Sequence, residues 1–540
     1  MTTGVPVGNT EYQQQQLMLK VAPHSKVMAA AEAVMSLPLP SPKTSFCLLT
    51  SCVIPMLSYA ARTTPPELAL AAFTEFDTAT QYHAERIMGL QPREVTYQQA
   101  TSGGGPPPLR LSAAAVAQLR MPTRAGGAGV SSVVEASQPA FVAAMAAVLP
   151  SVLSDQAAIS EQHAEALSDP LDLPLLRSLK LAVAGLSEKL GGDLPMGCTQ
   201  LAVQSYAAGA LGHPLLHRAA VEQEGPIYQA QRTLAGAASK AAWKNLLAAV
   251  NDTPDSTIRE QEMARLKSLH MPGSLGTTWL SYGLYTTAFD GIMWQLALSR
   301  LLGYEKRTAV CNACGKQQGG TIHARWCQAP DSRAGQVTVV HNIVRDELGA
   351  ILEPCTGFTA AAEAHDCFLA GEDPAFRMDQ LTLPGAFAAV AVSNPSYGKR
   401  IMVDVSFIEE QSASHRTQAA EQGPLQALED RENTKKVRYQ GSFDPGCFLL
   451  RTVAVGSFGA VGPQGHELID AMATQYVARR GFAGVAAAAE YKSSAMAMIR
   501  GRLSVSLQMA LSARVLKYLS VPFAGAEAAG AGEYGLWDIE

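Results

Sequence analysis

The seventeen residues CNACGKQQGGTIHARWC, numbered 311 to 327, constrain this 540-residue chain more than any other segment. Three of its nine cysteines and a histidine lie here with the spacing C-x2-C-x8-H-x3-C. A C-x2-C turn closed by a His/Cys pair supplies the four ligands of structural zinc sites. We therefore expect a structural Zn²⁺ held by Cys311, Cys314, His323 and Cys327. The alternative is that the cysteines are incidental and that His323 is a surface residue.

The zinc prediction agrees with the rest of the composition. A segment of about 30 residues cannot bury enough core to fold alone, and a bound metal can hold it together. Scattered thiols are typical of a reducing compartment, so we expect an intracellular protein. The remaining cysteines are Cys47, Cys52, Cys198, Cys355, Cys367 and Cys447.

Hydropathy and charge exclude two broad classes. No run of 18 uninterrupted apolar residues occurs, and the best run, PAFVAAMAAVLPSVL (139–153), is broken by Pro150. We interpret that run as a buried helix and expect no membrane span. The N-terminus lacks the basic start and apolar block of a signal peptide. A net charge of -5 argues against a generally basic nucleic-acid coat but allows a local basic groove.

The first 305 residues have helical patterns. PPELALAAFTEFDTATQYHAERIMGL (65–90) begins with two prolines and predicts a helix. In YTTAFDGIMWQLALSRLLG (285–303), the i, i+3, i+4, i+7 spacing predicts that four apolar residues share one buried face. The expected core positions are Leu68, Phe73, Phe76, Ile87 and Met88 in the first helix, and Phe289, Ile292, Met293 and Leu296 in the second.

After residue 306 the pattern changes to mixed helix and strand. HNIVRDELGAILEP (341–354) predicts a helix, and QLTL (380–383), RIMVDVSFI (400–408) and FLLRTVAVG (448–456) predict strands. In the second strand Ile401, Val403, Val405 and Phe407 point one way, and Met402, Asp404, Ser406 and Ile408 the other. Long helices are expected at 463–480 and 484–519.

These patterns predict an α+β multidomain chain. The all-α half would comprise residues 1–130 and a helical linker domain, 131–305. A small zinc knuckle at 306–335 would then lead into an α/β domain at 336–520 and a flexible tail at 521–540. Around the knuckle, five basic residues form a patch suited to phosphates: Lys306, Arg307, Lys316, Arg325 and Arg333.

Two other histidine motifs do not support a site. His213 and His217 in HPLLH have helical spacing but lack the glutamate of a zinc-protease motif. VVHN at His341 could belong to an HNH-type nuclease, but no second C-x2-C follows to support that fold.

The order of the motifs resembles the C-terminal half of non-LTR retrotransposon polyproteins that carry a restriction-like endonuclease of the PD-(D/E)XK type. The knuckle is followed by a helix, an Arg-x-Asp, a strand with Asp and a lysine-rich helix, as in that family. Other segments resemble the family from end to end: GVPVG (4–8), CVIPMLSYAARTTPPELALAAFTEFD (52–77), RMPTRAGGAGVSS (120–132), GSLGTTWL (273–280) and FDPGCFLLRTVAVGSFGAVGP (443–463).

The resemblance implies a nuclease function for the α/β domain, and no polymerase activity is expected of this chain. Residues 1–130 would correspond to a thumb and connector region, and the chain lacks the paired aspartates of a polymerase palm. We therefore expect a Mg²⁺-dependent DNA endonuclease that nicks a target for primed reverse transcription. Its partners would be DNA, element RNA and a polymerase portion on another chain, in the nucleus. The alternative is a catalytically inactive nucleic-acid-binding remnant of a mobile element.

The resemblance also implies the site residues. Asp379 in FRMDQ and Asp404 in MVDVS match the two Mg²⁺-binding acids, and Lys435 or Lys436 in RENTKKVRY matches the displaced catalytic lysine. Glu353 in LEP is a candidate upstream acid. Met378 stands where the family has proline, and 24 residues separate the two aspartates. From the residues alone, Asp404 could lie on a wet strand face, Asp379 could be an ordinary loop acid, and KKVR could be a solvated helix face or a nuclear import signal.

Overall fold

The computed structural model describes residues 9–35, 41–145, 174–189, 228–282, 289, 291–304, 314, 320–327, 336–373, 376–481 and 485–518. The chain forms two compact units. The first comprises Met1–Pro40, Thr44–Pro122 and Gly129–Leu246, and the second Ser41–Lys43, Thr123–Ala128 and Leu247–Glu540. The described residues are mostly helical, with one small mixed sheet, which agrees with the predicted α+β class.

Up to residue 251 the described elements with printed bounds are helices. They are α1 (Thr10–Val21), α2 (Lys26–Met35), α3 (Pro42–Leu48), a π-turn (Leu49–Val53), a 3₁₀ turn (Ile54–Leu57), α4 (Ser58–Thr63), α5 (Pro66–Ile87), α6 (Tyr97–Ala100), α7 (Ala113–Arg120), a 3₁₀ turn (Thr123–Ala125), α9 (Pro174–Lys189) and α12 (Tyr228–Asn251).

Helix α5 is the predicted helix at 65–90, and its buried acids fasten other segments of the first unit to it. Asp77 accepts the backbone N–H groups of Val133 and Val134 at 2.8 and 3.2 Å, at the start of the helical stretch that follows. Glu85 accepts the N–H groups of Arg110 and Leu111 at 2.8 and 3.1 Å. These carboxylates satisfy backbone donors that burial would otherwise leave unpaired, so we assign them a structural role.

The second unit contains the sheet and the remaining described helices. They are α13 (Ser256–His270), α14 (Trp279–Tyr282), α15 (Gly291–Leu301), α16 (Gly320–Trp326), α18 (Gln336–Thr356), β1 (Ala361–Ala364), β2 (Met378–Leu381), α19 (Ala388–Ala391), a 3₁₀ turn (Pro395–Gly398), β3 (Arg400–Ile408), α20 (Arg416–Gln422), α21 (Leu425–Arg438), β4 (Phe448–Gly456), α22 (Pro463–Arg480) and α23 (Val485–Tyr518).

The sheet has the order β1-β2-β3-β4. The β1–β2 and β2–β3 pairs are antiparallel, whereas β3 and β4 are parallel, with Asp404 opposite Thr452. The connection between the parallel strands passes through α20 and α21. Helix α21 contacts both β3 and β4, and this places its lysines next to the strand that carries Asp404.

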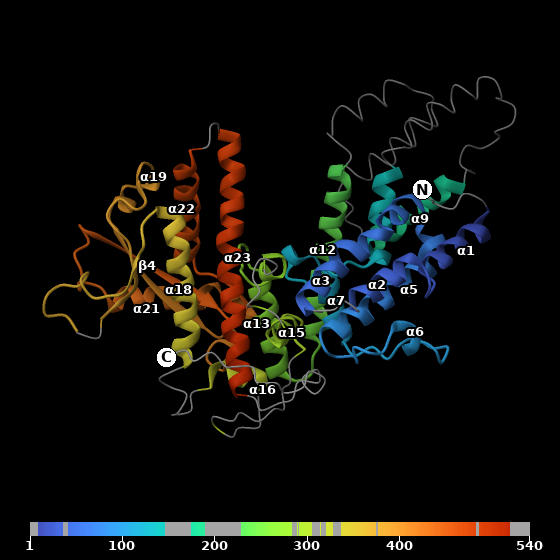
Figure 1. Ribbon diagram of the computed structural model, residues 1–540, viewed down its shortest axis with the longest axis horizontal. Coiled ribbons are helices and arrows are strands. Elements are labelled where there is room, and N and C mark those ends of the chain that lie inside the picture. Colours follow the sequence, from blue (N-terminus) through green and yellow to red (C-terminus); the bar gives the residue numbers. More distant parts are fainter. Residues whose placement is uncertain are drawn as a thin grey trace. The chain divides into compact units, whose positions relative to one another are not determined.

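The three longest helices of this unit cover one face of the sheet. Helices α18, α22 and α23 run side by side (Figure 1), and each contacts the other two. Ile401, Val403 and Val405 of β3 are buried in the same apolar cluster as residues of all three helices. The alternating pattern of β3 therefore gives one apolar face to the helices and leaves Asp404 on the other.

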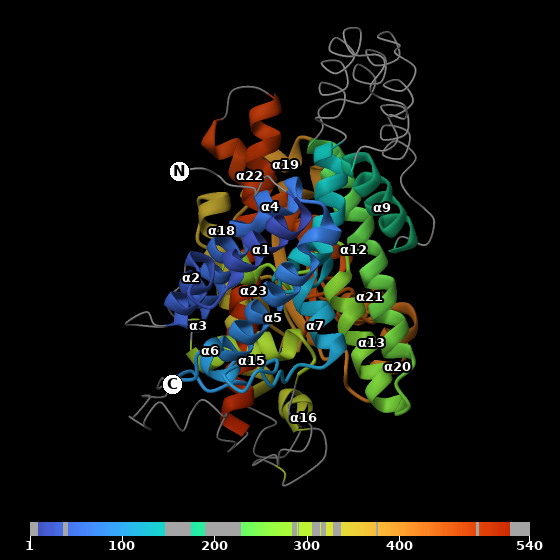
Figure 2. The ribbon, with the colours of Figure 1, turned by 90° about the vertical axis from the view of Figure 1, so that its right-hand side faces the viewer.

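Helices that precede the sheet in sequence also pack within the second unit. Helix α13 lies along α20 (Figure 2), and Arg416 of α20 forms an ion pair with Glu260 of α13 at 3.0 Å. Helices α14 and α15 contact α23. The rings of Trp279 and Trp294 meet edge to face with centroids 5.7 Å apart.

Two segments quoted from the sequence meet backbone to backbone. The N–H of Leu275 donates to the carbonyl of Gly459 at 2.6 Å. Gly459 has a φ of +84°, and a Cβ there would lie 2.3 Å from the backbone nitrogen of Gly276. Only glycine fits this approach. The close backbone contact therefore explains the glycines of GSLG (273–276) and SFGA (457–460) that meet here.

The strand and helix predictions for the second unit agree closely with the structure, with three exceptions. Strands β3 and β4 and helix α22 have the predicted bounds, while β2 begins two residues before the predicted QLTL and β1 was not predicted. The predicted face of 285–303 is wrong. Phe289 is buried, but Ile292, Met293 and Leu296 are only half-buried. Trp294, Ala297, Leu298 and Leu301 face the core instead, because Trp294 packs against Trp279.

In the first helix, Phe73, Phe76, Ile87 and Met88 are buried as predicted, and Leu68 is half-buried. Among the described residues, one helical run, Pro42–Thr63, is long and apolar enough to cross a membrane, with a mean hydropathy of 1.5 and 44% of its window buried. A largely buried core helix of a soluble protein passes the same test.

Candidate functional site

Two aspartates lie side by side on neighbouring strands of the sheet. In the β2–β3 pair, Gln380 is opposite Val403 and Leu381 is opposite Met402. Continuing this antiparallel register by one residue places Asp379 opposite Asp404. Only 6% of Asp379 and 3% of Asp404 is exposed. The structure therefore brings together the two acids that the sequence analysis singled out.

Both carboxylates are held in place by their surroundings. The backbone N–H of Val405 donates to Oδ2 of Asp379 at 2.6 Å. Burial raises the pKa of Asp404. The ammonium of Lys435 opposes that shift and the negative charge of Asp379 adds to it, so the net pKa is above its usual value. The hypothesis of a wet strand face at Asp404 is wrong, because that face is covered by α21.

Lys435 provides the positive charge next to these acids. Its Nζ lies 3.0 Å from Oδ1 of Asp404 in a hydrogen bond and 2.9 Å from Oδ2 in an ion pair. The lysine side chain is 15% exposed. Lys436, the other candidate, is exposed. Successive residues of a helix point about 100° apart, so only one of the two neighbours can face the strand.

The orientation of α21 is fixed by another buried acid, Glu432. Its carboxylate accepts the N–H of Gln464 at 3.2 Å in the first turn of α22, and its backbone carbonyl accepts from the hydroxyl of Thr452 at 3.3 Å. Burial raises the pKa of Glu432 to about 7. Lys435 follows three residues later on the same helical face, so these contacts direct its side chain toward Asp404.

Tyr439 closes the site on the side of α21. It is 3% exposed, and its hydroxyl hydrogen-bonds to Asp404. Burial and the negative charge of Asp404 both raise the pKa of Tyr439, so the phenol stays protonated and donates. The rings of Phe368 and Phe376 pack against it, with centroids 5.7 and 5.4 Å away. This aromatic cluster excludes water from one side of the carboxylates.

His341 joins the site from α18, although it was not among the residues that the sequence predicted for the site. Its Nε2 lies 3.0 Å from Oδ2 of Asp379 and its Nδ1 lies 3.2 Å from Oδ1 of Asn342. Burial lowers the pKa of His341, but the hydrogen bond and charge of Asp379 outweigh it, so the net pKa is raised. The available signal was a histidine beside the apolar stripe of a predicted helix, which VVHN displays.

This arrangement can bind a cation and orient a water molecule. Ligand atoms of His341, Asp379 and Asp404 all lie within 4.8 Å of one another. Carboxylate oxygens are the ligands of hard divalent cations, usually with waters and phosphate completing the shell. His341 and Lys435 are the two more exposed members of the group, with 24% and 15% of their side chains accessible. Solvent and ligands therefore approach from their side.

A second group of metal-type ligands comes from the predicted knuckle. Cys314, His323 and Cys327 have ligand atoms within 4.8 Å of one another, and Sγ of Cys314 lies 2.9 Å from Nε2 of His323. Two ligands of a tetrahedral zinc lie about 3.5 Å apart, so binding requires only a small outward shift. Cys311, the fourth predicted ligand, lies outside the described residues.

Replacing Cys327 tests this centre, because the thiol is buried and its loss leaves at most three ligands. We expect Cys327→Ser to lower the zinc content of the purified chain from about one per molecule toward zero. Amide hydrogen exchange in 320–327 should rise at the same time. Cys367→Ser is the matched control, since Cys367 is also buried but donates to the carbonyl of Ala364. Equal zinc content in both variants would contradict the prediction.

Arg325 is the only described member of the predicted phosphate-binding patch, and the prediction is wrong for it. Its side chain is 0% exposed, and its Nε lies 2.9 Å from Oε2 of Glu409. The guanidinium also stacks on Phe458, 5.3 Å from the ring centroid. Arg325 therefore attaches α16 to the end of β3 and cannot reach a phosphate. Lys306, Arg307, Lys316 and Arg333 lie outside the described residues.

The proposed upstream acid does not belong to the site. Glu353 is exposed near the C-terminal end of α18, twelve residues after His341. Twelve residues of helix span about 18 Å, so the histidine takes the place near Asp379 that the sequence analysis gave to an acid.

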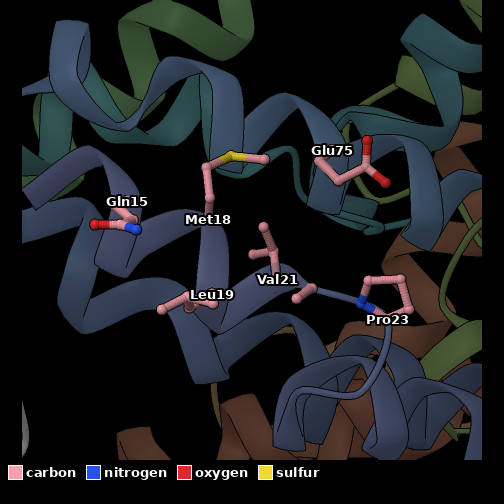
Figure 3. Close-up of a pocket in the computed structure, with 7 residues that line it drawn as sticks. Gln15, Met18, Leu19, Val21, Pro23 and Glu75 are labelled. Carbon is pink, nitrogen blue, oxygen red and sulfur yellow. The ribbon is translucent and has the colours of Figure 1, made fainter. Parts of the chain in front are cut away.

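A hollow of about 320 Å³ lies in the first unit (Figure 3). Its lining is mostly apolar: Gln15, Met18, Leu19, Val21, Ala22, Pro23 and Glu75. Its one carboxylate, Glu75, already accepts a hydrogen bond from the hydroxyl of Tyr97 at 2.8 Å. None of the side chains that line this hollow is therefore suited to catalysis.

Comparisons with known proteins give no relative that could assign this site. No protein-family model matches the chain, and no curated protein matches it.

Proposed function

We propose that the second unit is a divalent-metal-dependent DNA endonuclease of the restriction-like type, in a retrotransposon-type protein without a polymerase palm. One observation carries the proposal. Asp379, Asp404 and Lys435 come from two strands and a helix and converge in one largely buried cluster. Burying two acids beside a single ammonium destabilises a fold. Such a cluster is therefore typical of a functional site. Mg²⁺ is the cation that the resemblance implies, and Zn²⁺ would be structural at the knuckle.

Each residue has a role in phosphodiester cleavage. A divalent cation at the acids would neutralise charge on the scissile phosphate and lower the pKa of bound water. Asp379, fixed by the N–H of Val405, and Asp404 would hold that cation. The ammonium of Lys435, beside Asp404, would orient the attacking water and stabilise the charge that develops on the phosphate. Arg377, an exposed residue two positions before Asp379, would contact a flanking phosphate.

The physiological role follows the same resemblance. Nicking of a DNA target would prime reverse transcription by a polymerase portion on another chain, with element RNA, in the nucleus. The inactive nucleic-acid-binding alternative has weaker support in the described residues, because Arg325 of its proposed basic patch is buried against Glu409.

A comparison of the adjacent lysines tests the proposal. With supercoiled plasmid and Mg²⁺ or Mn²⁺, wild type should produce open circles, and Lys435→Met should lower the initial rate about 10²-fold or more. Lys436→Met should change the rate less than about threefold, since that side chain is exposed. Lys435→Arg keeps a charge beside Asp404 and serves as the folding control.

Two outcomes would overturn the proposal. The first is a wild-type chain, folded and zinc-loaded, that never nicks DNA with either cation. The second is equal loss of activity in the Lys435 and Lys436 variants, which would place the catalytic ammonium elsewhere.

A further inference from the structure

His341 converts the pair of acids into a mixed nitrogen and oxygen ligand set. Its Nε2 points to Asp379, and ligand atoms of all three side chains lie within 4.8 Å of one another. Mg²⁺ prefers an all-oxygen shell, whereas imidazole favours first-row transition dications. The composition of the cluster therefore bears on which metal it selects.

The contacts of the imidazole agree with a metal ligand. Nδ1 lies 3.2 Å from Oδ1 of Asn342, so in one tautomer Nδ1 donates its proton to this oxygen and leaves Nε2 as the metal-binding nitrogen. Metal-binding histidines commonly donate their second ring N–H to such a group, which fixes the ring. The Nε2 lone pair is then directed at Oδ2 of Asp379, 3.0 Å away. Two acceptors facing each other at that distance require a proton or a cation between them.

The same 3.0 Å separation fits two ligands of one metal ion. Ligands at adjacent corners of an octahedral shell with bonds of about 2.1 Å lie roughly 3.0 Å apart. His341 and Asp379 could therefore bind one ion without moving apart. Asp404, the third ligand, has Lys435 at 2.9 Å from Oδ2, and the ammonium would keep one oxygen while the metal takes the other.

A neighbouring polar group on the same strand face could hold water in the shell. Ser406 lies two residues after Asp404 on β3 and is 3% exposed. Its hydroxyl has no hydrogen-bond partner among the described residues. Alternate strand residues lie on the same face about 6.6 Å apart, which is within reach of a metal-bound water. A buried hydroxyl without a partner is unfavourable unless it binds a ligand or water.

We propose that His341, Asp379 and Asp404 form one site for a first-row transition dication, of the Mn²⁺ type, which they bind in preference to Mg²⁺. This inference rests on the proposed function for its biological meaning. It concerns metal binding, however, and can be tested without DNA cleavage.

Direct metal binding to the full chain, loaded with one equivalent of Zn²⁺ for the knuckle, tests the inference. Mn²⁺ titration followed by electron paramagnetic resonance should give one site that a tenfold excess of Mg²⁺ fails to empty. Electron spin-echo modulation should show coupling of bound Mn²⁺ to a nitrogen nucleus. His341→Ala should remove that coupling and weaken Mn²⁺ binding about 10-fold or more, with Mg²⁺ binding nearly unchanged. His365→Ala is the matched control, because His365 is exposed and donates toward the carbonyl of Phe376.

A second variant keeps the test decisive if His341→Ala is unstable. His341→Glu replaces the imidazole with a third carboxylate and should shift the preference toward Mg²⁺. Bound Mn²⁺ without nitrogen coupling, or equal affinity for the two cations in the wild type, would overturn the inference. Such a result would leave the nuclease proposal intact if the plasmid is still nicked. Conversely, Mn²⁺ bound through nitrogen in a chain that never nicks DNA would support this inference and contradict the proposed function.

Discussion

Asp404→Asn should abolish plasmid nicking, by about 10³-fold or more, while the folded protein keeps its thermal stability or gains some. In the proposed site, a carboxylate that holds the metal would contribute several kcal/mol to transition-state stabilisation, and each 1.4 kcal/mol is about tenfold in rate. Asparagine has the same shape and retains an oxygen for Lys435 and Tyr439. The substitution also removes the buried negative charge of the Asp404 carboxylate, whose pKa is raised by burial and by the charge of Asp379. Activity and stability would therefore change in opposite directions.

The assay needs both measurements on the same preparation. Nicking rates with saturating Mg²⁺ or Mn²⁺ should be compared with melting temperatures from circular dichroism. Asp366→Asn is the control, since Asp366 is an acid of the same unit with 69% of its side chain exposed. A marked fall in the melting temperature of Asp404→Asn would show that its carboxylate is structural. Undiminished nicking would exclude it as a metal ligand.

Arg325→Met should destabilise the second unit by about 3–5 kcal/mol, the usual cost of breaking a buried ion pair. Arg325 and Glu409 are both buried. Glu410 lies beside them. Its pKa is raised to about 7, first by its full burial and second by the negative charge of Glu409. Without the guanidinium, two neighbouring glutamates would have lost their buried cation. Urea unfolding followed by tryptophan fluorescence measures the change.

Two further variants isolate the effect of charge. Arg416→Met breaks a half-exposed ion pair with Glu260 and should cost less than about 1 kcal/mol. Adding Glu409→Gln to Arg325→Met should recover part of the loss, because the unpaired charge disappears. If Arg325→Met costs no more than Arg416→Met and instead weakens DNA binding, the phosphate-binding prediction would be revived.

Local sequence pattern was a good guide to the elements around the site. Period-two alternation located β3, and the apolar run FLLRTVAVG located β4. The unfavourable position of Asp404 in mid-strand identified it as a residue that needs a partner. β1, with the sequence AAEA, escaped prediction because alanine and glutamate have little strand propensity, and its pairing with β2 makes it a strand.

The chain's own sequence determined the candidate ligand types, the alternation of β3 and the lysine-bearing helix, since spacing along a strand or helix fixes which residues share a face. The tertiary structure decided the rest. The rotation of α21 selected Lys435 over Lys436, the packing of α18 brought in His341 instead of Glu353, and the burial of Arg325 turned a presumed phosphate contact into an internal ion pair. These outcomes depend on how distant segments pack against one another, which no local pattern encodes.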